Sequence, residues 1–329
     1  MSVGEEPRRT LGRYVLERSL GSCGSADVHL ARDPLLDRPV AIKCPRRGLP
    51  VDGELLAEAR ALAKLSHPSI VSVLDVGAED GRLFLVLEHL AGPSLADLVD
   101  RQGSRLAPER AVELLRGPAE GLDHAHSAGF LHRDLKPENL LAVVDCDLRG
   151  RKGPPAELKV TDFGLAALAG SERGSRGLGD PRFVAPEAWR GEADASSDRF
   201  ALAAIAFWLL AGQPALPGRG PQEWARAAGE PERRRLRDLR PTLPSALDAA
   251  FAAVLSPRRH ERPETAVGCM ELIAGAIASG AERRRQVDEA RSRIASKDVR
   301  GKRYCDECRL PLSPRAESCP KCGGPASVR

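Results

Sequence analysis

The sequence predicts an α+β protein with a small β-rich lobe, a larger helical lobe and a compact cysteine-rich module. Three observations support this fold class. Short β-like runs dominate residues 14–90, and one helical stretch, 53–67, lies among them. Helical patterns dominate from residue 94 to about 278, with strand-like segments near Leu140 and Val160. Two Cys-x-x-Cys pairs follow, at 305–308 and 319–322.

These elements divide the chain into a predicted domain at 14–278, a basic linker or helix at 279–303 and a cysteine-rich module at 304–324. The β-like runs are RYVLERSL (13–20), RPVAIKC (38–44) and LFLVLEHL (83–90). The longest apolar run, FALAAIAFWLLAG (200–212), is too short to span a bilayer and predicts a buried helix. Stretches rich in glycine and proline at 148–157 and 170–181 predict surface loops.

Composition and charge favour a cytoplasmic globular protein that does not associate with membranes. The 329 residues are 42% apolar and 29% charged, and the first ten contain no apolar run typical of a secretion signal. The net charge of +4 is uneven, because residues 281–329 hold thirteen Lys and Arg against seven Asp and Glu. Such a basic tail either contacts nucleic acid or an acidic partner, or is simply a solvated helix.

A lysine and a glutamate stand out near the β-like runs. Lys43 ends the run VAIK and is one of eight lysines, against forty-two arginines. Glu58 lies in the apolar stripe that Leu55, Leu62 and Leu65 form, where a carboxylate is costly to bury without a cation. A Lys43–Glu58 pair would offset that cost and could hold the α- and β-phosphates of a nucleotide. The alternative is a lysine that is merely solvated at the end of a strand.

A run of polar residues between the helical patterns predicts phosphoryl-transfer chemistry. HRDLKPENL (132–140) sets Asp134, Lys136 and Asn139 in one short loop. Asp134 could accept the proton of a hydroxyl, Lys136 could balance charge on a phosphoryl group, and Asn139 could ligate a metal ion. Downstream, TDFG (161–164) offers Asp162, a hard oxygen ligand suited to Mg²⁺ or Mn²⁺.

Together, VAIK, HRDLKPEN, DFG and APE (185–187) resemble the motifs of the protein kinase family, and specifically of the bacterial eukaryotic-like Ser/Thr kinases. The resemblance spans about residues 14–277. It implies a bilobal protein kinase fold, with a β-rich N-lobe and a helical C-lobe, that uses ATP and Mg²⁺ and acts on protein substrates. The catalytic roles that it implies fall on Asp134, Lys136, Lys43 and Glu58, with Asn139 and Asp162 as metal ligands.

The same resemblance implies a place for adenine and the supports of the loop. Adenine would contact Val28, Ala41 and Leu141 and the backbone of a hinge from Glu88 to Leu90, behind the gatekeeper Leu87. The side chains expected to stack as a spine are Leu62, Val73, His132 and Phe163. Asp198 matches a buried aspartate that steadies the catalytic loop, and Arg262 matches an arginine that pairs with Glu187.

The glycine-rich loop, LGSCGSADV (20–28), departs from the family pattern G-x-G-x-x-G-x-V. Gly21 and Val28 match, whereas Cys23 and Ala26 stand where the pattern has glycine, and Gly24 is displaced by one position. Glycines allow the backbone to approach phosphates closely, and the replacements are small. We therefore expect a variant phosphate loop, in which Gly24 supplies the flexibility and nucleotide binding is weaker or slower.

A second departure lies in GDPRFVAPE, where Asp180 stands in place of the family's threonine. The hydroxyl of that threonine bridges the catalytic aspartate and lysine, here Asp134 and Lys136. The carboxylate is expected either to form a salt bridge with Lys136 or to lie near Asp134 as a like charge. The preceding loop holds two hydroxyls, Ser171 and Ser175, which are either autophosphorylation sites or plain loop serines.

The cysteine-rich module, YCDECRLPLSPRAESCPKCGG (304–324), resembles a zinc ribbon. Cys305, Cys308, Cys319 and Cys322 form two pairs, each able to present two thiolates from one tight turn. Four thiolates suit a closed, structural Zn²⁺ site, and the metal would supply the folding energy of so short a segment. The alternatives are a redox pair or two disulfides. A ribbon of this kind either binds a protein, binds a nucleic acid or only stabilises the chain.

These observations predict an ATP-dependent Ser/Thr protein kinase. Cys23, Ala26 and Asp180 favour an alternative, a nucleotide-binding pseudokinase scaffold that acts through its zinc ribbon. A second alternative is a nucleic-acid adaptor that carries the kinase domain for regulation. The presence of every expected catalytic residue favours the enzyme, because phosphoryl transfer depends on positioning and charge neutralisation by all of them.

Overall fold

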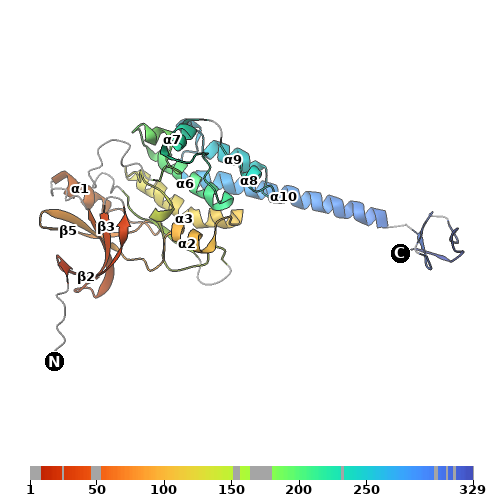
Figure 1. The fold of residues 1–329 in the computed structure, drawn as a ribbon, viewed down its shortest axis with the longest axis horizontal. Coiled ribbons are helices and arrows are strands. Elements are labelled where there is room, and N and C mark those ends of the chain that lie inside the picture. Colours follow the sequence, from red (N-terminus) through yellow and green to blue (C-terminus); the bar gives the residue numbers. More distant parts are fainter. Residues whose placement is uncertain are drawn as a thin grey trace, which may run out of the picture. The chain divides into compact units, whose positions relative to one another are not determined.

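The computed structural model describes residues 9–23, 26–45, 53–150, 156–163, 180–230, 233–299, 303–308, 310–313 and 316–328. The chain forms two compact units, divided between Ile277 and Ala278. The first unit consists of a sheet lobe followed by a helical lobe (Figure 1), as the sequence predicts.

The sheet lobe holds six antiparallel strands in the order β1-β2-β3-β4-β6-β5. They are β1 (Thr10–Leu11), β2 (Tyr14–Cys23), β3 (Ala26–Asp33), β4 (Arg38–Pro45), β5 (Val73–Glu79) and β6 (Arg82–Glu88). Val40 and Ile42 of β4 pack with Phe84 and Val86 of β6 in one apolar cluster. Because successive strand residues face opposite sides, Lys43 lies on the other face, together with Ala41.

One helix, α1 (Gly53–Leu62), connects β4 to β5. It is shorter than the predicted helix, which extends to residue 67. Hydrogen bonds from the N–H groups of Lys64 and Leu65 to the backbone oxygens three residues earlier close the chain into tight turns after Leu62. Pro68 then disfavours the helical conformation of His67, so the helix does not resume.

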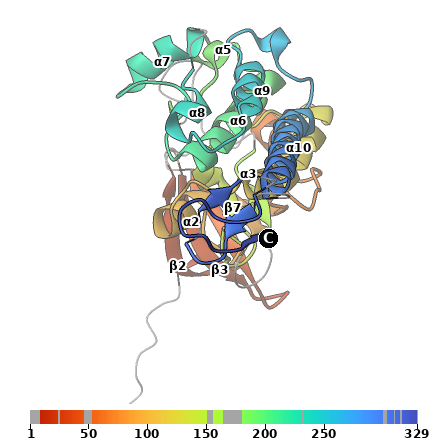
Figure 2. The ribbon, with the colours of Figure 1, turned by 90° about the vertical axis from the view of Figure 1, so that its right-hand side faces the viewer.

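The helical lobe is built around a buried helix, α6. Its helices are α2 (Leu95–Gln102), α3 (Pro108–Ser127), α5 (Pro186–Trp189), α6 (Ala195–Ala211), α7 (Pro221–Gly229), α8 (Leu236–Leu239) and α9 (Ala246–Val254). Asp194 and Ser197 form a capping box at the start of α6, and Gly212, with a φ of 75°, ends it. Nearly all its side chains are buried, as the apolar run predicts. Figure 2 shows α6, α8 and α9 grouped together.

A short hairpin lies where the two lobes meet. Its strands, β7 (Leu140–Ala142) and β8 (Leu158–Val160), are the predicted strand-like segments. Val160 accepts a hydrogen bond from the N–H of Val71 at 2.9 Å and donates one to Ser69 at 2.8 Å. Two 3₁₀ turns, η1 (Pro137–Asn139) and η2 (Arg259–Glu261), complete the lobe. Of the predicted loops, residues 151–155 and 170–179 lie outside the described residues.

A single helix, α10 (Ala266–Val299), runs across the predicted boundary at 278 and therefore belongs to both units. Its start is capped by Asp123 of α3, whose carboxylate accepts the N–H groups of Ala266 and Val267 at 2.7 and 2.9 Å. The second unit ends in a three-stranded antiparallel sheet of β9 (Arg303–Cys305), β10 (Pro311–Leu312) and β11 (Ala326–Val328), with β9 in the centre. Among the described residues, no helix is both long enough and apolar enough to cross a bilayer.

Candidate active site

The β2–β3 hairpin carries the glycine-rich segment. Gly21 has a φ of +146°, a conformation that residues with side chains rarely adopt, and it pairs with Val28 across the hairpin. Cys23 and Ala26 are strand residues paired with each other. An extended strand conformation suits any residue, so neither of these positions requires glycine. Gly24 lies outside the described residues.

Lys43 of β4 meets Asp162, which follows β8 by two residues. Their side chains form an ion pair with 2.8 Å between Nζ and Oδ2, and Lys43 is buried. Burial alone would raise the pKa of Asp162, but the charge and hydrogen bond of Lys43, together with His132 and Thr161, outweigh burial, so the pKa is lowered. Asp162 has a φ of 71°, a strained conformation of the kind that clusters at functional sites. The side chain of Glu58 lies outside the described residues, so the Lys43–Glu58 pair stays a prediction.

The loop that contains Asp134 brings together three of the predicted residues. Nζ of Lys136 lies 2.8 Å from Oδ2 of Asp134. The Nδ2 group of Asn139 donates to the backbone oxygen of Asp134 at 2.7 Å, which turns its amide oxygen away from that contact. The other carboxylate oxygen of Asp134, Oδ1, is buried and has no hydrogen-bond partner among the described residues.

A buried carboxylate on α6 holds this loop in place. Asp198 accepts the backbone N–H groups of His132 and Arg133 at 2.8 Å, and it lies 2.8 Å from Nε2 of His126. Burial raises the pKa of Asp198, but the hydrogen bond from His126 and the nearby histidines outweigh burial, so the pKa is lowered. Arg133 has a φ of 65°, and the two backbone hydrogen bonds to Asp198 fix Arg133 and the preceding His132 in place. The predicted role of Asp198 in steadying the loop is confirmed.

Behind the loop, the aromatic rings of His132 and Phe163 meet edge to face, with 4.9 Å between their centroids. His132 also lies 2.8 Å from the backbone oxygen of Thr161, next to Asp162. Phe163, Val73 and Leu62 line one small cavity with Leu87. The predicted spine residues and the predicted gatekeeper are therefore neighbours.

The APE segment is fixed by a fully buried ion pair. Nη1 and Nη2 of Arg262 lie 2.6 and 2.9 Å from the two oxygens of Glu187, and Ser197 donates a further hydrogen bond at 2.8 Å. Burial would raise the pKa of Glu187, but Arg262 and Ser197 lower it overall. This pair is the one that the sequence predicts.

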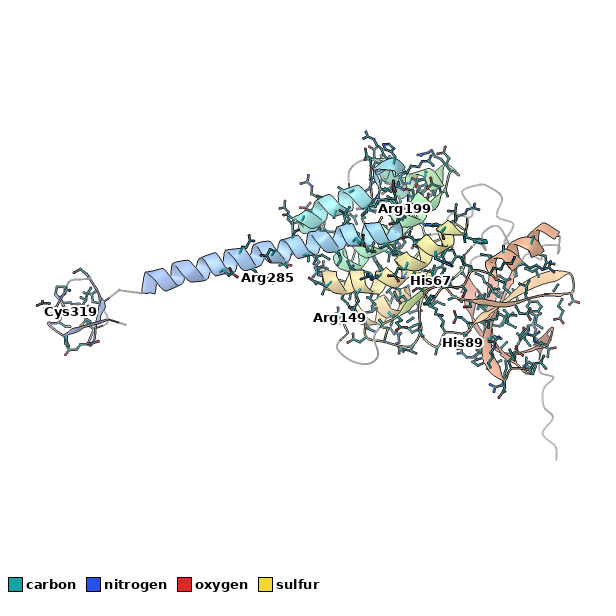
Figure 3. The ribbon with its side chains drawn as sticks, turned by 180° about the vertical axis from the view of Figure 1, so that it is seen from behind. His67, His89, Arg149, Arg199, Arg285 and Cys319 are labelled. Atoms are coloured by element: carbon teal, nitrogen blue, oxygen red, sulfur yellow. The ribbon has the colours of Figure 1, made fainter. Side chains whose placement is uncertain are left out.

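The predicted hinge carries an ion pair that sequence reasoning missed. The carboxylate of Glu88, in β6, lies 2.8 and 2.9 Å from Nζ of Lys159 in β8. It also accepts the N–H of Ser72 at 2.8 Å. His89 follows in the hinge (Figure 3), and burial lowers the pKa of its imidazole. The predicted adenine contacts Val28, Ala41 and Leu141 are all half-buried.

Asp180 has an ion-pair partner that the sequence prediction did not name. Nε of Arg182 lies 2.9 and 2.8 Å from the two oxygens of Asp180, and Nη2 of Arg182 contacts the same carboxylate. Asp180 and Asp134 both line one small cavity. The carboxylate of Asp180 is paired with Arg182, whereas Lys136 is paired with Asp134, so both predicted arrangements of Asp180 stay predictions. Ser171 and Ser175 lie outside the described residues.

The four cysteines of the second unit converge. The sulfur atoms of Cys305, Cys308, Cys319 and Cys322 all lie within 4.8 Å of one another. Adjacent sulfurs are 3.3 to 3.6 Å apart, much longer than the roughly 2.05 Å of a disulfide bond. Sulfurs on a tetrahedral Zn²⁺ at about 2.3 Å would be roughly 3.8 Å apart, so the donor set fits a Zn²⁺ ion. Figure 3 marks Cys319 in this module.

Comparison with known proteins agrees with this geometry. Residues 14–277 match the family model "Protein kinase domain". The serine/threonine-protein kinase PrkC of Bacillus subtilis is 32% identical over 267 residues, which cover 79% of this chain and 40% of PrkC. PkaB of Streptomyces coelicolor, also a serine/threonine-protein kinase, is 41% identical over 217 residues, 62% of this chain and 50% of PkaB.

The chain thus spans a half or less of the length of these relatives. Among solved structures, the kinase domain of Mycobacterium tuberculosis PknI matches with a TM-score of 0.61 and 23% identity, over 83% of this chain and all of that one. This likeness shows the fold, which is bilobal with a β-sheet N-lobe and a helical C-lobe. Given the family match and the Ser/Thr kinase relatives, this chain belongs to the protein kinase family.

Proposed function

We propose that this chain is an ATP-dependent serine/threonine protein kinase, which transfers the γ-phosphoryl group of ATP to protein hydroxyls. One observation carries the proposal: the loop of Asp134, Lys136 and Asn139 is ordered by buried Asp198, and Lys43 forms a buried ion pair with Asp162. Phosphoryl transfer needs these groups in fixed positions more than it needs covalent chemistry.

Each residue of the loop has a distinct task in this proposal. The buried Oδ1 of Asp134, which lacks a partner among the described residues, accepts the proton of the substrate hydroxyl. Lys136, paired with the other oxygen, neutralises charge on the transferred group. Its position two residues after the base favours Ser or Thr over Tyr as the acceptor, in keeping with the named activity of the relatives.

The nucleotide would lie between the lobes. Asn139 and Asp162 offer amide and carboxylate oxygens, which are the ligands that Mg²⁺ and Mn²⁺ prefer. Lys43 would hold the α- and β-phosphates, with Glu58 of α1 as the carboxylate partner that the sequence predicts. Gly21 and Gly24 shape the phosphate loop, while the backbone of Glu88 and Leu90 contacts adenine, which is packed by Val28, Ala41 and Leu141.

The pseudokinase alternative is less favoured. It relied on the missing glycines and on Asp180. Cys23 and Ala26 occupy regular strand positions, which need no glycine, and Asp180 is neutralised by Arg182. The groups that perform phosphoryl transfer remain in place, so the departures reduce the rate rather than abolish it.

For the second unit we propose a structural Zn²⁺ held by Cys305, Cys308, Cys319 and Cys322. The convergence of four sulfurs supports this, because a closed set of four thiolates is typical of structural zinc. Reduced thiols and a supply of ATP both suit the cytoplasm, where we propose that the protein acts.

The test measures transfer of the phosphoryl group from Mg·ATP to a basic protein substrate and to the chain itself. Mass spectrometry then identifies the phosphorylated residues. Wild type should phosphorylate Ser and Thr, and Asp134→Asn should lose at least about a hundredfold in rate. Phosphotyrosine as the main product would contradict the acceptor class. An equal rate in the two chains would contradict the role of Asp134.

A further inference from the structure

Asp180 and Arg182 form a self-contained unit two residues apart. Besides the two contacts of the Arg182 guanidinium, the backbone N–H of Arg182 donates to Oδ1 of Asp180 at 3.0 Å. The side chains are 16% and 34% exposed, so water screens their charges only in part. A planar guanidinium that binds both oxygens of a carboxylate is a strong and well-oriented partner.

The place of this pair gives it a consequence for catalysis. Asp180 lines a small cavity together with Asp134, Phe183 and Ser197. Within the same site, Oδ2 of Asp134 is paired with Lys136. A third charge at this point would disturb that pair, because an unpaired carboxylate beside an Asp–Lys pair attracts the lysine and repels the aspartate.

Arg182 is well suited to prevent the disturbance. The hydrogen bond to Asp180, together with the charges of Asp180, Glu138 and Asp100, outweighs burial and raises the pKa of Arg182 above its usual value. An arginine guanidinium is not deprotonated in proteins, so this side chain is a lasting cation. With Arg182 bound, Asp180 presents no net charge to Lys136.

We propose that Arg182 is a positioning residue, which binds Asp180 as an internal counter-ion and so keeps Lys136 paired with Asp134. The inference rests on the proposed kinase activity. It makes the carboxylate at position 180 and the arginine at position 182 dependent on one another. An arginine is needed here only because an aspartate stands where the family has a threonine.

The test compares steady-state transfer by wild type, Arg182→Ala, Asp180→Thr and the double variant Asp180→Thr/Arg182→Ala. Arg182→Ala should lower kcat about tenfold to a hundredfold, because it exposes Lys136 to Asp180. The KM for ATP should change less than about twofold, because the nucleotide lies at Lys43 and Asp162. The double variant should recover most of the loss, since a hydroxyl at 180 needs no counter-ion.

Two comparisons keep the result interpretable. Arg116→Ala, which removes an exposed arginine that pairs with Glu120 on α3, should leave both constants unchanged. A double variant as slow as Arg182→Ala would overturn the proposal, since a loss of folding or of substrate contacts is not rescued by Asp180→Thr. Full activity in Arg182→Ala would overturn it as well. An inactive wild type would instead refute the kinase activity itself, and this role with it.

Discussion

At the scale of single residues, this protein contains carboxylates whose negative charge is stabilised by a nearby cation or hydrogen-bond donor. Asp162, Asp198 and Glu187 are each largely removed from water, and each has a lowered pKa because cations or hydrogen-bond donors outweigh the effect of burial. Such partners are costly to remove, because the charge that stays behind is buried without compensation.

The Glu187–Arg262 pair allows the cost of leaving a buried charge without its partner to be measured. Glu187→Gln should lower the free energy of unfolding at pH 7 by about 3 kcal/mol, the cost of leaving the Arg262 guanidinium buried with a neutral partner. Urea unfolding of wild type and variant gives the difference directly. Glu192→Gln, which removes an exposed carboxylate nearby, is the control and should cost less than about 1 kcal/mol.

The difference in the free energy of unfolding between wild type and Glu187→Gln should become smaller as the pH falls. The pKa of Glu187 is lower in the folded than in the unfolded protein, so the unfolded state binds more protons between the two values. The stabilisation is therefore complete above about pH 4.3, the usual value for Glu, and it is lost as the pH falls through the folded pKa. A difference between the two chains that grows on acidification would contradict this.

Single residues also show what the sequence could not reveal. The motif residues were found because their chemistry is read from contiguous letters. Arg182 was missed because it belongs to no family motif. It gains a partner only because Asp180, a carboxylate, stands where the family has a hydroxyl. Arg240 donates to the backbone oxygens of Leu106 and Leu210, and a sequence shows such an arginine only as surface charge.

At the scale of elements, the predicted strands and the buried helix were correct, because alternation and apolar runs are local signals. The predicted end of α1 was five residues too late, because tight turns at Lys64 and Leu65 close the helix after Leu62, and the helical pattern of the letters does not show them. Contacts between elements whose residues belong to no family motif were out of reach. Asp123 caps a helix that starts 143 residues later, and Glu88 pairs with a lysine 71 residues away.

The Glu88–Lys159 pair connects the hinge strand to the strand that leads to Asp162. Lys159→Met should lower the free energy of unfolding by about 1 to 2 kcal/mol, because Glu88 stays partly buried without its cation. Arg116→Met, at an exposed pair on α3, should cost no more than about 0.5 kcal/mol. Equal losses in urea unfolding would show that the hinge pair is no stronger than a surface pair.

At the scale of the whole molecule, two units with different sources of stability share one helix. The first unit has a large apolar core and a second apolar cluster in its sheet lobe. The second has short strands and a cluster of cysteines, so its stability depends on the proposed metal. The sequence predicted both modules, because kinase motifs and paired Cys-x-x-Cys motifs are distinctive.

Removal of zinc should therefore affect the units differently. The purified chain should contain about one Zn²⁺, and chelation should accelerate amide exchange in residues 303–328 while leaving the kinase unit unchanged. Cys319→Ala should lose the metal, whereas Cys269→Ala, a buried cysteine of α10 in the first unit, should retain it. A Cys319→Ala chain that still holds one equivalent of zinc would contradict the assigned ligands.

The measurement that tests the central claim most directly is transfer of radiolabel from ATP in the presence of Mg²⁺, with the label at either the γ- or the α-phosphate. The account predicts that wild type transfers the γ-label to protein and not the α-label, and that Asp134→Asn binds ATP but transfers neither. Binding of ATP without transfer by wild type would contradict it, and would make the chain a nucleotide-binding scaffold.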